Sequence, residues 1–245
     1  DTMSGMANFE TNGADIHYDE YGEGFPVLLI APGGMKSEVS FWNSTPWNPI
    51  EQLRGAFRVI AMDQRNAGRS TGPIDASDGW HTYTQDQIAL LDHLGVDRFA
   101  VAGMCIGGPY AMGLIAEVPE RVSAAVLFQT IGLTSNRGAF FEMFDDWANE
   151  LKNFRPDLTE EDWQSFKHNM YGSDNYLFNV DNEFVKGVET PLLILKGDDL
   201  YHPEDSSLRT HQLAQNSTLV EDWKSGVAME AAARQFMEFI ETHAS

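Results

Sequence analysis

The chain has 245 residues, 42% of them hydrophobic, which is enough to bury one sizeable core. Its net charge of -21 argues against nucleic-acid binding, which needs clustered lysine and arginine. The acidic residues are spread along the chain, so they indicate a soluble acidic surface. The single cysteine, Cys105, excludes an intrachain disulfide and a metal site made of cysteines alone.

No targeting or membrane-spanning segment is visible in the sequence. Residues 1–9 contain neither a basic region nor an apolar run, and no apolar run elsewhere is long enough to cross a membrane. We therefore expect a cytoplasmic protein that does not bind membranes.

The first third of the chain predicts a hairpin followed by two buried strands. Residues 8–21 form the hairpin and turn at Asn12-Gly13. Residues 26–31 are an unbroken apolar run, which is typical of a strand covered on both faces. A helical region interrupted by proline follows over 38–54, and the next strand is 57–62.

The rest of the chain alternates between helices and strands. We expect strands at 99–102, 122–128, 191–195 and 218–223, and helices at 83–94, 106–119, 204–215 and 227–242. This alternation predicts an α/β fold with a mostly parallel sheet of about eight strands and helices on both faces.

Residues 131–187 break the alternation. They are rich in phenylalanine, tryptophan, aspartate and asparagine and contain no apolar run like those of the strands. We interpret them as a helical cap inserted into a core made of residues 1–130 and 188–245. Their aromatic side chains either line an apolar or aromatic substrate pocket or simply attach the cap to the sheet.

Cys105 lies at a predicted strand-to-helix turn. Gly103 and Gly107 flank it at two residues on each side. A sharp elbow projects its apex side chain outward and closes tightly only where its neighbours lack a Cβ. The thiol is therefore a candidate nucleophile, beside amides that open the following helix.

These motifs together resemble the α/β-hydrolase fold family over nearly the whole chain. The resemblance includes the turn Pro32-Gly33-Gly34, the Asp-x-Arg-x-x-Gly-x-Ser loop over 63–70, the elbow Gly103-x-Cys105-x-Gly107 and the acidic turn Gly197-Asp198-Asp199. It implies an acyl-transfer site at the elbow. Two departures stand out: the usual elbow serine is cysteine here, and residues 223–229, after the last strand, lack the usual catalytic histidine.

The missing histidine leaves several candidates for the base. His202 follows the strand that ends at residue 195, on the turn where the family places its acid, and Asp199 or Asp198 would orient it. His202 could instead cap the next helix. His81 is a second candidate base, and a third possibility is that Cys105 ionises at the helix N-terminus without a base.

The resemblance also implies an oxyanion hole. The amide of Ile106, next to the nucleophile, would be one donor. Gly34 or Met35 in the glycine-rich turn would supply the other, because glycine allows close backbone approach.

The sequence therefore predicts a cysteine hydrolase. It would act on an ester, lactone or related activated acyl bond of a small apolar or aromatic substrate, as a monomer or homodimer. No metal or nucleotide motif is present, so we expect no cofactor. Two alternatives stay open: an acyltransferase or other non-hydrolytic enzyme of this fold, and a degenerate hydrolase that only binds a ligand. Cys105 could also be an engineered replacement of serine.

Overall fold

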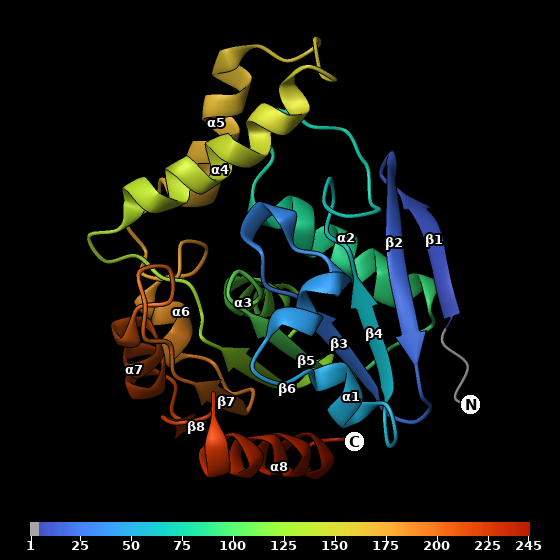
Figure 1. The fold of residues 1–245 in the computed structure, drawn as a ribbon, viewed down its shortest axis with the longest axis vertical. Helices are drawn as coiled ribbons and strands as arrows, with labels where there is room; N and C mark the ends of the chain where they lie inside the picture. Colours follow the sequence, from blue (N-terminus) through green and yellow to red (C-terminus); the bar gives the residue numbers. More distant parts are fainter. Residues whose placement is uncertain (1–4) are drawn as a thin grey trace.

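The computed structural model describes residues 5–245. Residues 1–4 lie outside the described residues. They belong to the predicted core and to the N-terminal segment in which we found no targeting signal. The described chain forms one eight-stranded sheet with helices around it (Figure 1).

The sheet confirms the predicted α/β class and its mostly parallel arrangement. Its strand order is β1-β2-β4-β3-β5-β6-β7-β8, and only the pairs β1–β2 and β2–β4 are antiparallel. The strands are β1 (Gly5–Thr11), β2 (Ala14–Tyr21), β3 (Pro26–Ile30), β4 (Arg58–Met62), β5 (Phe99–Met104), β6 (Val122–Phe128), β7 (Leu192–Leu195) and β8 (Ser217–Val220). The central strands β3, β5 and β6 are almost wholly buried, as unbroken apolar runs require.

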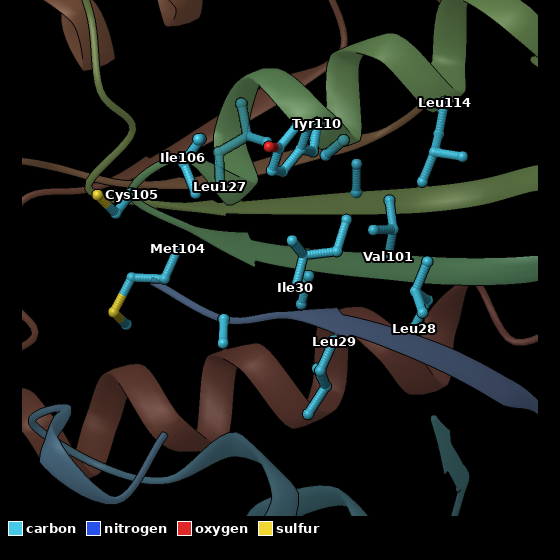
Figure 2. Packing of buried hydrophobic residues seen from close by; sticks show 14 of the residues in the cluster. Leu28, Leu29, Ile30, Val101, Met104, Cys105, Ile106, Tyr110, Leu114 and Leu127 are labelled. Carbon is cyan, nitrogen blue, oxygen red and sulfur yellow. The ribbon is translucent and has the colours of Figure 1, made fainter. Parts of the chain in front are cut away.

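Helices cover both faces of this sheet. Figure 2 shows α3 on one side of the central strands and α8 on the other. The core helices are α1 (Pro49–Leu53), α2 (Trp80–His93), α3 (Gly107–Glu117), α7 (Glu204–Leu213) and α8 (Gly226–Thr242), with short 3-10 helices η1 (Gly34–Lys36) and η2 (Val39–Ser44). Helix α2 begins three residues earlier than predicted, because the Thr82 hydroxyl accepts the amide proton of Gly79.

The segment between β6 and β7 contributes no strand among the described residues. It forms α4 (Arg137–Lys152), α5 (Glu160–Tyr171) and the short α6 (Asn182–Lys186). Figure 1 shows α4 and α5 together at one end of the molecule, away from the sheet. Aromatic rings of α4 and α5 contact each other: Trp147 packs edge-on against Trp163 and Phe166. These ring contacts hold the two helices together.

The loop over residues 63–70 is held by buried polar contacts. Arg65 donates two hydrogen bonds to the buried carboxylate of Asp86, at 2.8 and 2.7 Å. Asp63 accepts from the amides of Val39 and Arg69, both at 2.8 Å. The hydrogen-bonding groups of these side chains are therefore satisfied within the protein, and they hold the loop in place beside the strand ends.

The elbow after β5 is closed by glycine. A Cβ at Gly103 would overlap the carbonyl oxygen of Gly107, and a Cβ at Gly107 would lie 2.6 Å from the carbonyl oxygen of Ile30. The sequence argument for these two glycines therefore holds in atomic detail. Their absence of a Cβ lets α3 start directly against β3 and β5.

This packing makes a stability prediction. Gly107→Ala should destabilise the fold by about 1–3 kcal/mol, because backbone atoms of β3 must move to admit the methyl group. Gly138→Ala is the matched control, since Gly138 lies in helix α4 with open space around it. That variant should be neutral or stabilised by up to about 1 kcal/mol. Urea unfolding of both measures the difference, and equal effects would contradict the close approach at the elbow.

Candidate functional site

Cys105 occupies the apex of the elbow with left-handed backbone geometry. Its φ is +61°, which is uncommon for a residue other than glycine. Its amide donates to the carbonyl of Phe128 at 3.0 Å, and its carbonyl accepts from Gly108 and Ile131 at 3.1 and 3.2 Å. These three hydrogen bonds hold the strained conformation in place. Figure 2 shows the sulfur at the junction of β5 and α3.

Asp199 and His202 form a closed turn after β7. One carboxylate oxygen of Asp199 accepts from the amides of Tyr201 and His202, at 3.0 and 2.9 Å. The other oxygen lies 2.9 Å from Nδ1 of the His202 ring. The amide of Asp199 donates back to the carbonyl of His202 at 3.2 Å. An acid three residues before its histidine therefore reaches the ring because the backbone folds around the carboxylate.

This turn also needs a glycine. A Cβ at Gly197 would lie within 3.0 Å of His202 atoms, so a larger residue there would push the turn open. Helix α7 begins at Glu204, and no side chain caps its N-terminus at Pro203. The ring of His202 is therefore committed to Asp199 and does not cap α7.

The other ring nitrogen of His202 is buried and unused. Within residues 5–245, Nε2 has no hydrogen-bond partner. Burial alone would lower the pKa of His202, but Cys105 and then Asp199 outweigh it and raise the pKa to about 9. Cys105 is the largest cause of this rise, so its side chain faces the imidazole.

The carboxylate of Asp199 responds in the opposite direction. Burial would raise its pKa, but hydrogen bonds from His202 and Tyr201 outweigh burial and hold the pKa below its ordinary value. Asp199 thus remains ionised beside the imidazole. This is the electrostatic arrangement that fixes a histidine tautomer with Nε2 directed away from the acid.

Two of the predicted site residues lie elsewhere. Asp198 makes an ion pair with Lys224 on the surface and does not contact His202. His81 is exposed on the first turn of α2, where it lines an open hollow of about 780 Å³ with Trp80 and Phe178. No contact joins either residue to Cys105 or His202 in the described structure, so the geometry favours Asp199 over Asp198 and His202 over His81.

The predicted oxyanion residues have amides without partners. Gly33 and Gly34 both have positive φ, at 119° and 58°, and lead into η1. The amides of Gly34, Met35 and Ile106 donate to no acceptor among residues 5–245. All three residues are buried and lie at helix starts, so these free N–H groups are available to an anionic oxygen.

Helix α4 packs against the glycine turn, a contact that the sequence did not predict. The Met143 sulfur sits where a Cβ on Gly34 would come within 2.5 Å, so α4 rests on the glycine turn. A groove of about 320 Å³ runs beside it, lined by residues that include Gly33, Met35, Met143, Trp147 and Tyr201. This groove joins the glycine turn to the neighbour of His202.

In residues 5–245, no three histidine, cysteine, aspartate or glutamate side chains gather as a metal site would require. None of the described helices has the length and apolar character needed to span a membrane.

Comparisons with known proteins agree with the observed fold. A family model described as "alpha/beta hydrolase fold" matches residues 26–187. The chain is 32% identical over 155 residues to the 2-hydroxymuconate semialdehyde hydrolase of Pseudomonas putida, covering 61% of this chain and 50% of that protein. It is 28% identical over 246 residues to the bifunctional esterase/perhydrolase DCH of Acinetobacter calcoaceticus, covering 85% and 88%.

Among solved structures, the meta-cleavage product hydrolase CumD of Pseudomonas fluorescens IP01 superposes with a TM-score of 0.70 at 22% identity. The match covers 96% of this chain and 97% of that one. Several other curated relatives are matched over only 40–53% of their own length.

The geometry predicts how His202 titrates. Because its folded pKa of about 9 exceeds the ordinary 6.5, protonation stabilises the fold fully below about pH 6.5, and this contribution is lost as the pH rises through 9. NMR titration of the ring should show the raised value. Asp199→Asn should lower the pKa of His202, whereas Asp198→Asn should leave it unchanged. An equal response to both substitutions would contradict the assignment of Asp199.

Proposed function

Because the chain belongs to the alpha/beta hydrolase fold family, whose model matches residues 26–187, we propose that it is a hydrolase acting through a Cys105 acyl-enzyme. Its substrate is an ester, lactone or related activated acyl compound that is small and apolar or aromatic. Residues 131–187 act as the lid of the site.

The observation that carries the proposal is the half-buried His202 ring, whose buried Nε2 faces Cys105. Asp199 occupies Nδ1, Nε2 is unpartnered, and the sulfur raises the pKa of the imidazole, which burial alone would lower. A nucleophile, a base and an acid that orients the base are the three parts of this catalytic arrangement. Here the base comes from the turn after β7 instead of the segment after the last strand.

The proposed reaction has two halves. Below about pH 9 the His202 ring is protonated, so Nε2 has already taken the thiol proton when the Cys105 sulfur attacks the carbonyl carbon. The amides of Ile106 and of Gly34 or Met35 hold the anionic oxygen. The imidazolium then returns its proton to the leaving oxygen as the carbon–oxygen bond breaks, which leaves a thioester. Water attacks this thioester with His202 as base, and the acid product leaves with the thiol restored.

The similar proteins support the reaction class and leave the substrate open. Their names describe hydrolases of different carbonyl compounds. One fold hosting several chemistries is expected, so the site of this chain carries the proposal.

Acyl transfer is the second candidate, favoured by the closure of the site. Cys105 is only 8% exposed, so a thioester formed there would be shielded from bulk water and available to a bound alcohol, thiol or amine. Product ratios with and without such acceptors separate transfer from hydrolysis. A protein that only binds ligands is disfavoured, because the Asp199–His202 pair would then have no role.

Substitution of the nucleophile tests the proposal. With a p-nitrophenyl ester, wild-type protein should give a burst of nitrophenol followed by slower turnover. Cys105→Ala should abolish the burst and lower turnover by about three orders of magnitude or more. Thermal unfolding provides the folding control. Unchanged turnover in a folded Cys105→Ala protein would contradict the proposal.

The raised pKa of His202 predicts the alkaline limit of activity. Above about pH 9 the imidazole loses the proton that the leaving oxygen needs, so kcat/KM for a methyl ester should fall. The kcat/KM for the p-nitrophenyl ester of the same acid should fall much less, because nitrophenolate leaves without protonation. Parallel pH profiles for the two esters would contradict the acid role of His202.

A further inference from the structure

Tyr171, the last residue of α5, places a hydroxyl group deep beside the site. Its side chain is 0% exposed, and its ring packs against Phe140, Phe178 and Trp80. Buried hydroxyl groups ordinarily have a strong hydrogen-bond partner. The partner of Tyr171 in the described residues is the Met35 sulfur at 3.7 Å, which is a weak acceptor.

The position of this hydroxyl group points to the substrate. Met35 belongs to the glycine turn that offers free amides, so the hydroxyl lies on that side of Cys105. Burial raises the pKa of Tyr171 well above its ordinary value, with Cys105 the next cause. The Tyr171 hydroxyl therefore stays protonated, and an acceptor better than sulfur would give it a stronger hydrogen bond. Tyr110, on the first turn of α3, has a second buried hydroxyl with no partner among residues 5–245.

Resting on the proposed function, we infer that the Tyr171 hydroxyl binds a neutral oxygen on the acyl half of the substrate. The acyl half is assigned because the groove at Gly33, Met143 and Tyr201 opens outward, where an alcohol would leave, whereas Tyr171 is wholly enclosed. The oxygen is neutral because, in residues 5–245, the contacts of the Tyr171 side chain are aromatic rings and the Met35 sulfur, and a buried unpaired carboxylate is costly.

The substrate class that fits is therefore a carboxylic ester or lactone with an ether, keto or hydroxyl oxygen in its acyl chain. Plain alkanoyl esters would leave the hydroxyl with its sulfur partner. A site built to hydrogen-bond one oxygen discriminates against analogues that lack it.

Two isosteric esters test the inference. p-Nitrophenyl methoxyacetate differs from p-nitrophenyl butyrate only by oxygen in place of one methylene group. Tyr171→Phe should lower kcat/KM for the methoxyacetate by about tenfold while changing the butyrate value by less than about threefold. Tyr176→Phe is the matched control, because the buried Tyr176 hydroxyl has a good partner in Thr210 at 2.9 Å. It should leave the ratio of the two esters unchanged.

A second measurement does not depend on the variant folding. Divided by the rates of alkaline hydrolysis without enzyme, the wild-type kcat/KM should favour the methoxyacetate. Equal loss for both esters in Tyr171→Phe, or no wild-type preference after this correction, would overturn the inference while leaving the hydrolase intact. Wild-type protein inactive on both esters would instead overturn the proposed function, and the inference with it.

Discussion

The site depends on one local interaction, the closure of the turn after β7 around the carboxylate of Asp199. That carboxylate accepts two backbone amides and the His202 ring within four residues of chain. Without it, Nδ1 of the imidazole would lose its acceptor, and the pKa of His202 would be lower. The turn therefore supplies both orientation and charge to a histidine that comes from an unusual loop.

The elbow provides the other half of the arrangement. Gly103 and Gly107 permit a contact that no Cβ would allow, and three backbone hydrogen bonds hold Cys105 at positive φ. Figure 2 shows the sulfur at the end of a sheet whose interior is packed with apolar side chains. A rigid core thus holds the reactive Cys105 sulfur on a strained backbone, which is a common way for a scaffold to fix a reactive group.

Much of this was predictable because it rests on local rules. Unbroken apolar runs predicted the central strands, and the glycine spacing predicted the elbow. The histidine of the hairpin shows where such rules fail. His17 is buried between Asn8 and Asp19 because the loop of residues 63–70 covers its strand, a contact that no pattern within the hairpin predicts. Similarly, nothing local distinguishes Asp198 from Asp199; their different partners follow from how the turn folds. The positions of Tyr171 and Met143 beside the site depend on how α4 and α5 pack, which a sequence pattern does not specify.

The central claim is that the Cys105 sulfur carries the acyl group. Intact-mass spectrometry of protein quenched in acid milliseconds after mixing with an activated ester tests it directly. The account predicts a mass increase equal to one acyl group, mapped by peptide analysis to Cys105 and released by hydroxylamine. Turnover without any adduct, or an adduct on another residue, would contradict it.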